Sequence, residues 1–172
     1  SLVIATGGLS IPTMGATGFG YDVARQFGHN IIPTRAALVP FTLNKRALAR
    51  QQDLPGTSLA VNASCGEGHF HEQMLFTHKG LSGPAVLQIS SHWREGKPVA
   101  FDLAPGLDLP EWLGEQRGKK PESYLHTLLA ELWSKKLVQF FLRVKDIQSK
   151  PLKQYSDSEV KSLGEKLQTW SL

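Results

Sequence analysis

The sequence is poor in cysteine and contains no long apolar run. Its 172 residues include a single cysteine, Cys65, which excludes an intrachain disulfide framework and any zinc site built from several cysteines. The apolar stretches are short, such as Leu2–Ala5 and Phe140–Leu142, and a membrane-spanning helix needs roughly 20 such residues. These absences predict a protein of a reducing compartment, which we expect to be cytoplasmic and without a membrane partner.

The sequence also lacks a strong excess of one charge. Its 19 Lys and Arg residues face 15 Asp and Glu residues, which leaves a net charge of +4. Basic residues are most frequent from Lys135 to Lys153, in a pattern more typical of a solvated helical face than of a nucleic-acid interface with aromatic platforms. Nucleic acid is therefore not the expected partner. Hydrophobic residues make up 41% of the chain, which is typical of a globular protein and argues against disorder.

Two common nucleotide-binding motifs are missing. The chain contains neither a Walker A motif nor the dinucleotide fingerprint G-x-G-x-x-G. The segment Gly15–Gly20 has the reverse spacing, G-x-x-G-x-G, and no acidic residue stands clearly at the ribose-binding position. The sequence opens inside a predicted strand, without an initiator Met or a targeting segment. We therefore expect the chain to be a piece of a longer protein.

Residues 1–34 predict a strand, a glycine-rich turn, a helix and a second short strand. The strand is the apolar run Leu2–Ala5, and Ala5–Gly8 forms the turn after it. The helix is expected to begin near Thr17 or Gly18, with Gly28 as its C-terminal cap. His29–Ile32 is then a returning strand. This order predicts a βαβ-like arrangement.

Residues 35–104 are rich in short β-type runs separated by glycine and proline. Such spacing predicts a small antiparallel barrel or sandwich. Pro40 interrupts the first run, which makes that strand an edge strand or a bulged one. Gly66–His69 has the composition of a hairpin turn. The runs are Ala37–Leu43, Ser58–Ala63, Gln73–Thr77, Ala85–Ser90 and Pro98–Leu103.

Residues 105–172 predict a bundle of three to four helices. Within Pro121–Trp133, leucines recur at the spacing of an amphipathic helix. Ser134 is placed to cap the following helix. Ser156 and Glu159 form a predicted capping box for a final helix, whose buried face we expect to extend to Trp170. The predicted fold class is therefore α+β, with the barrel and the bundle sharing one core.

A cluster around the predicted hairpin has residues that could bind a metal. His69 and His71 would face the same side of a strand, and two histidines with a carboxylate can hold a transition metal. The turn is expected to be exposed, however, and no distant further ligand is marked. We therefore predict no metal site from this cluster, which consists of Cys65, Glu67, His69, His71 and Glu72.

Two blocks of the sequence resemble one flavoprotein family. The first runs from Leu2 to Phe41 and includes Ala5–Gly8, and the second is Leu75–Ser90. Both resemble the middle of the BaiN/YhiN-like NAD(P)/FAD-dependent oxidoreductases. The resemblance implies an edge of a Rossmann-type FAD-binding domain at residues 1–34. It further implies the barrel part (35–104) and the helical part (105–172) of a domain inserted into it.

The resemblance also implies roles for individual residues. Ala5, Thr6, Gly7 and Gly8 would border the FAD of the parent protein, with NAD(P)H as the reductant. The inserted domain would cap the flavin, and we hypothesise that His78, Ser82 and Gly83 face a small-molecule substrate. Because the fingerprint is absent, we expect the chain alone to hold no FAD and to be inactive. Its expected partner is the remainder of the FAD-binding domain.

Two other interpretations remain open from the residues alone. The chain could be a small nucleotide-binding or RNA-binding module built on the barrel. It could also be a structural or oligomerisation module without catalysis, in which the exposed strand Leu2–Ala5 self-associates through a partner edge. The substrate and the choice between NADH and NADPH stay undetermined.

Overall fold

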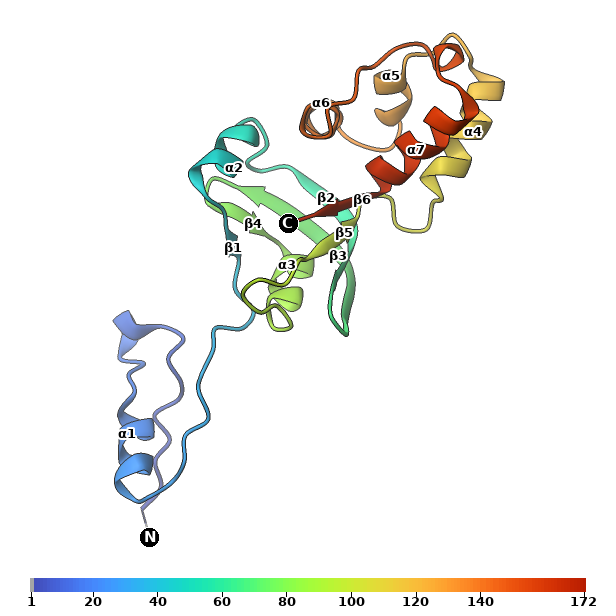
Figure 1. Cartoon of the computed structure of the whole chain (residues 1–172). Coiled ribbons are helices and arrows are strands. Elements are labelled where there is room, and N and C mark those ends of the chain that lie inside the picture. The colour runs from blue at the N-terminus through green and yellow to red at the C-terminus, as the bar shows by residue number, and fades with distance from the viewer. Residues whose placement is uncertain (1) are drawn as a thin grey trace. The chain divides into compact units, whose positions relative to one another are not determined.

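A computed structural model describes residues 2–172, and the chain forms two compact units that divide between residues 35 and 36. The first unit contains the short 3-10 helix η1 (Pro12–Met14) and helix α1 (Phe19–Gln26) (Figure 1). Helix α1 confirms the predicted helix. It ends just before Phe27 and Gly28, and Gly28 has the positive φ of 79° expected of a residue that stops a helix.

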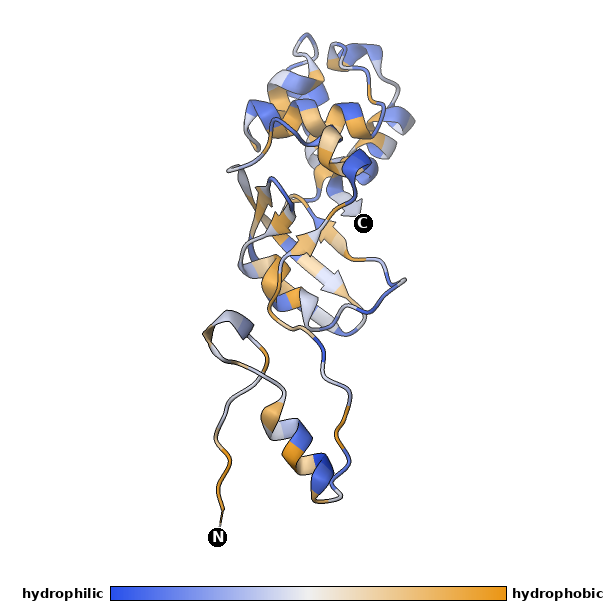
Figure 2. Cartoon of the chain, turned by 90° about the vertical axis from the view of Figure 1, so that its left-hand side faces the viewer, coloured by the Kyte–Doolittle hydropathy of each residue, from blue (hydrophilic) through white to orange (hydrophobic). Residues whose placement is uncertain are grey.

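The two strands predicted in the first unit are not formed, so the βαβ-like arrangement is wrong. Neither Leu2–Ala5 nor His29–Ile32 is part of a strand, and no residue from 2 to 35 is buried. A strand requires hydrogen bonds to a neighbouring strand, and within this unit the two segments have no such neighbour. Apolar residues nevertheless run along the N-terminal segment and α1, as Figure 2 shows in orange.

The second unit is built on a curled antiparallel sheet that forms a half-barrel, and this confirms the predicted α+β class. The six strands have the order β1-β4-β3-β2-β5-β6. The edge strand β1 follows Pro40, as predicted, and β6 forms the other edge. The strands are β1 (Phe41–Thr42), β2 (Ser58–Cys65), β3 (Gly68–Thr77), β4 (Gly80–Ser82), β5 (Ala100–Asp102) and β6 (Thr169–Ser171).

The hairpin of β2 and β3 sets which residues reach the core. Cys65 pairs with Gly68 across the predicted turn. Val61 and Ala63 are buried, whereas Asn62 between them is exposed, because successive side chains of a strand point to opposite faces. The sheet therefore has one apolar face that packs into the core and one polar face.

Helix α3 (Pro84–Ser90) replaces a strand that we predicted at Ala85–Ser90. Pro84 stands at the start of the helix, where its missing N–H costs nothing. Ala85, Val86 and Ile89 are buried, and they share one helical face that packs on the sheet. A short apolar run fits a strand and a buried helix equally well, so the strand prediction from periodicity alone was wrong.

The remaining helices include the predicted bundle, α4 to α7, at one end of the sheet (Figure 1). Ser134 caps α6 by accepting from Leu137 N–H, and Ser156 and Glu159 form the predicted capping box of α7. A further short helix, α2, was not predicted. The bounds are α2 (Lys45–Arg50), α4 (Leu109–Lys119), α5 (Leu125–Leu129), α6 (Lys135–Val144), the 3-10 helix η2 (Leu152–Gln154) and α7 (Asp157–Gln168).

Trp170 does not extend the final helix, contrary to the prediction. Helix α7 ends at Gln168, and Trp170 lies in β6 opposite Phe101 of β5. Its ring also lies 5.8 Å from the ring centroids of Phe140 and Phe141 on α6. Trp170 therefore joins the sheet and the helices in one core, which confirms the predicted shared core.

One buried hydrogen bond ties the same two parts together. Trp133 Nε1, just before α6, donates to the backbone oxygen of Leu103 after β5 over 2.9 Å.

Among residues 2–172, no helix has both the length and the apolar character needed to cross a membrane.

Candidate functional site

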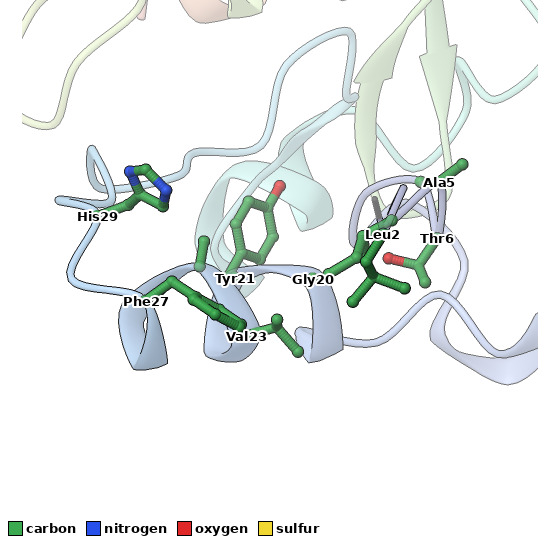
Figure 3. Close-up of a pocket in the computed structure, with 11 residues that line it drawn as sticks. Leu2, Ala5, Thr6, Gly20, Tyr21, Val23, Phe27 and His29 are labelled. Atoms are coloured by element: carbon green, nitrogen blue, oxygen red, sulfur yellow. The ribbon is translucent and has the colours of Figure 1, made fainter.

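The first unit carries a pocket of about 580 Å³ between its N-terminal segment and α1 (Figure 3). One wall is Leu2, Ile4, Ala5, Thr6 and Gly7, and the other comes from α1 and the residues that follow it. Apolar side chains supply most of the lining. The hydroxyl groups of Thr6 and Tyr21 and the imidazole of His29 add polar groups.

Glycine lets the two walls of the pocket approach each other. A Cβ atom on Gly20 would lie 2.9 Å from Thr6 Oγ1 and 3.7 Å from Ile4 Cγ2, and the first distance is too short for a real side chain. Gly7 has a φ of 69°, a left-handed conformation that other residues rarely adopt. Both glycines are therefore needed for the path of residues 4–8 beside α1.

The structure brings together three of the four predicted cofactor-binding residues. Ala5, Thr6 and Gly7 line the pocket, and Gly8 is not part of its lining. The remaining wall was not predicted as part of a site, although the helical spacing of the residues on α1 was visible in the sequence. No sequence signal marked His29. The added lining residues are Gly20, Tyr21, Val23, Ala24, Phe27 and His29.

The pocket suits part of a flavin dinucleotide. Its volume lies in the range of small-molecule sites, roughly 300–1,000 Å³. An apolar wall with Val23 and Phe27 can cover a flat ring system, while Thr6, Tyr21 and His29 offer hydrogen bonds to its edge or to a ribose. Ala5–Gly7 and the lining residues of and after α1 are therefore the groups that could hold such a cofactor along one side.

The three residues predicted to face a substrate lie in the β3–β4–α3 segment, but they do not converge. His78 is exposed in the turn between β3 and β4, and Ser82 pairs with Leu75 at the far end of β4. No hydrogen bond joins His78 to Ser82 in the structure of residues 2–172. The segment does not form a nucleophile–base pair.

Two glycines in this segment are required by close backbone packing. A Cβ atom on Gly83 would lie 2.6 Å from the Gln73 oxygen, and one on Gly80 would lie 2.1 Å from the Phe41 oxygen. Both residues also have positive φ values, 89° and 144°. The distinctive Lys79–Pro84 sequence is thus explained by how tightly β1, β3 and α3 pack around it.

The residues of the metal-binding candidate cluster do not gather. His71 Nδ1 lies 2.6 Å from Asn62 Oδ1 on the polar face of the sheet, whereas Cys65 is buried with Sγ toward the backbone oxygen of His92. Among the residues that the structure describes, no three His, Cys, Asp or Glu side chains are placed to share a metal ion.

Comparison with known proteins relates this chain to a named domain family and to full-length enzymes. The family model for the HI0933-like protein barrel and H2TH domain matches residues 35–172. The ribosomal RNA dihydrouridine synthase of Escherichia coli K12 is 46% identical over 170 residues, which cover 98% of this chain and 42% of that protein. The enzyme of the same name from Haemophilus influenzae is 42% identical over 177 residues, which cover 99% of this chain and 42% of that protein.

A more distant relative carries another activity in its name. The 3-dehydro-bile acid delta(4,6)-reductase of Clostridium scindens is 29% identical over 158 residues, which cover 85% of this chain and 38% of that protein. The chain therefore spans about two fifths of the length of the curated relatives it matches.

Proposed function

Because the chain belongs to the HI0933-like family of flavoproteins through its barrel and H2TH domain, we propose that it is part of a flavin-dependent reductase of ribosomal RNA. In this proposal the whole protein converts uridine to dihydrouridine. The second unit caps the site, and the first unit borders the cofactor. The chain covers 42% of the relatives that carry this activity in their names.

The observation that carries this proposal is the similarity along the whole chain to two proteins of the same name. It covers 98% and 99% of this sequence at 46% and 42% identity, so it includes the pocket of the first unit as well as the barrel. The bile-acid reductase is less similar, at 29% identity. We therefore favour an RNA substrate over the small molecule expected from the sequence.

The reaction needs a reductant, for which we propose NAD(P)H. Forming dihydrouridine saturates the C5–C6 bond of the uracil ring with one hydride and one proton, and NAD(P)H leaves as NAD(P)⁺. Bound FAD would supply the hydride transfer between nicotinamide and base. Ala5, Thr6 and Gly7 would border the FAD, with Tyr21 and His29 as hydrogen-bonding groups beside it.

The cap would contribute two polar groups near the base, the exposed His78 and the half-buried Ser82. His78 lies free in the β3–β4 turn and Ser82 lies at the end of β4. We propose that both face the substrate in the whole protein. Gly83 stays in the proposal only as the residue that lets α3 begin close to β3.

The partner that we propose for the first unit is the remaining part of the FAD-binding domain. None of residues 2–35 is buried, although Val3, Met14, Phe19 and Ile32, which lie outside the pocket, are large apolar side chains with more than half of their surface exposed. Burying such side chains stabilises a protein by roughly 1.5–3 kcal/mol each. Without that cover, the same residues would favour self-association of the chain.

Complementation tests the proposed function. A full-length protein containing this chain would be expressed in Escherichia coli that lacks its own ribosomal RNA dihydrouridine synthase. We expect restored dihydrouridine in digested ribosomal RNA, measured by mass spectrometry, and a flavin spectrum in the purified protein. His78→Ala and Ser82→Ala should lower the dihydrouridine yield without loss of flavin.

A matched change separates the cap residues from the rest of the surface. His69→Ala alters an exposed histidine on β3 and should leave the dihydrouridine yield unchanged. A full-length protein that binds flavin but restores no dihydrouridine would refute the RNA substrate. A full-length protein without flavin would refute the flavin-dependent mechanism.

A further inference from the structure

The helical part of the second unit carries a groove of about 640 Å³ that is separate from the cofactor pocket. Its floor is apolar and consists of Val138 and Leu142 on α6 with Ile147 beyond it. Its rim is polar and includes His126 on α5, Lys135 at the start of α6 and Ser149. None of these residues has a role in the proposed reaction.

The groove is shaped by the way in which α6 ends. Ile147 N–H donates to the Leu142 oxygen over 2.8 Å, and Asp146 N–H donates to the Arg143 oxygen over 3.3 Å. This pair of bonds is the Schellman motif, which requires a left-handed residue, and Asp146 supplies it with a φ of 52°. The motif turns the chain back, so that Ile147 and Ser149 line the groove beside α6.

Hydrogen bonds with Ser149 orient His126, which lies on the rim of the groove. Ser149 Oγ accepts from the backbone N–H of His126 over 3.0 Å and lies 2.9 Å from His126 Nδ1. The serine hydroxyl can then donate to Nδ1, which leaves the proton of a neutral imidazole on Nε2. The exposed His126 ring thus offers an oriented Nε2–H to a ligand in the groove.

The groove is also lined by Lys135, which is exposed and whose positive charge has no ion-pair partner among residues 2–172. The nearby Glu131 is already paired, since its Oε1 accepts from Lys120 Nζ over 2.8 Å. An anion in the groove would therefore meet Lys135 without a competing carboxylate.

An exposed aromatic ring lies beside His126. Tyr124, directly before α5, is 48% exposed, and its ring centroid lies 5.5 Å from that of His126. Unpaired bases stack on such exposed tyrosine and histidine rings, and lysine binds the phosphates between them. An apolar peptide would leave Lys135 and the His126 N–H without partners.

We propose that this groove binds a single-stranded segment of RNA, with a phosphate between Lys135 and His126 and a base against Tyr124. The choice of RNA as the ligand rests on the proposed function. The proposed contacts with Lys135, His126 and Tyr124 are argued from the structure of the groove and its surroundings. The helical part would then hold the RNA while a neighbouring nucleotide is reduced elsewhere in the protein.

Binding of a short fluorescently labelled single-stranded RNA to the chain tests the proposal by anisotropy. We expect Lys135→Gln to weaken binding roughly threefold to tenfold and to reduce its salt dependence, because one phosphate contact is lost. Tyr124→Ala should weaken binding about fivefold or more through lost stacking. Lys161→Gln on α7 removes the same charge from an exposed lysine outside the groove and should have little effect.

The outcome separates this inference from the proposed function. The proposal that the groove binds RNA would be overturned if all variants had equal affinity for RNA and equal urea midpoints. It would also be overturned if the wild-type chain bound no RNA. Neither result would alter dihydrouridine formation by the full-length protein. Loss of a protein partner in the Lys135→Gln variant, with RNA affinity unchanged, would assign the groove to that partner and overturn RNA as its ligand.

Discussion

Gly164 on α7 packs directly against Pro110 on α4, so that a Cβ atom at residue 164 would lie 2.4 Å from Pro110 Cα. The two helices can approach this closely only because Gly164 has a hydrogen atom in place of a side chain at the contact. Gly164 is buried, and glycine inside a helix normally reduces its stability. The contact between α4 and α7 offsets that cost.

Replacing this glycine should destabilise the chain even though alanine favours helices. We expect Gly164→Ala to lower the free energy of unfolding by about 2 kcal/mol, since overpacking typically costs about 1–3 kcal/mol. Gly114→Ala on α4 is the matched control, because nothing lies within 4 Å of its Cβ position. That change should raise stability by roughly 0.5–1 kcal/mol. Urea unfolding measures both, and a stabilising Gly164→Ala would contradict the close contact.

The hydrogen bond from Trp133 to Leu103 should stabilise the joint between sheet and helices. Trp133→Phe leaves the buried Leu103 oxygen without a donor, which costs roughly 1–3 kcal/mol. Trp93→Phe removes a similar bond, from Trp93 Nε1 to the Lys97 oxygen, at a residue that is 38% exposed. Its expected cost is below about 0.5 kcal/mol. Equal unfolding midpoints for the two variants would show that burial of the bond does not matter.

Asp146 is placed where glycine is preferred. Its left-handed conformation, with a φ of 52°, costs a residue with a Cβ atom roughly 1 kcal/mol or more. We therefore expect Asp146→Gly to raise the melting temperature. Asp146→Ala removes the same charge but keeps the strain, so it should bring no comparable gain. If both variants stabilise equally, the charge at the helix end is responsible instead.

The capping box of α7 predicts a pH dependence of stability. Backbone and side-chain hydrogen bonds with Ser156 hold the pKa of Glu159 below its ordinary value. The stabilisation is therefore present above the pKa of the unfolded chain and is lost as the pH falls through the lower, folded-state pKa. Glu159→Gln keeps an acceptor but cannot titrate.

The comparison of these two proteins checks the sign of the effect. The wild-type chain should unfold at higher urea than Glu159→Gln at neutral pH, and the difference should vanish in acid. A difference that does not change with pH would assign it to geometry alone.

If the proposed function is correct, the pocket of the first unit contributes to flavin binding in the full-length protein. Gly7→Val places a β-branched side chain at a φ of 69°, which such residues avoid. We expect the purified variant to retain less flavin than the wild type. Ser10→Val, nearby but outside the pocket, should retain as much. Equal flavin absorbance per protein in both variants would separate Gly7 from cofactor binding.

Local signals in the sequence were sufficient for much of the second unit. The caps at Ser134 and Ser156 depend on residues three positions away, and both were predicted correctly. The strand at Trp170 was not, because Leu167 and Trp170 are three residues apart and fit a helix. Its pairing with Phe101 depends on a strand about 70 residues earlier in the chain.

The candidate sites likewise combine residues that local sequence predicts with residues that only the folded chain brings together. Ala5, Thr6 and Gly7 were predicted as cofactor-binding residues through a resemblance of contiguous sequence, and they line the pocket of the first unit. Tyr21 and His29 required the folded path around α1. The groove could not be predicted, because Ser149 reaches His126 only through the left-handed turn at Asp146.

The return of β6 to the sheet has a consequence for synthesis of the protein on the ribosome. Strand β5 cannot pair on its outer edge, and Phe76 and Phe101 cannot meet Trp170, until residues 169–171 have emerged. The sheet must therefore wait for more than sixty further residues after β5 is made. During that interval the outer edge of β5 is unpaired, so this core is completed only after α7 has been made.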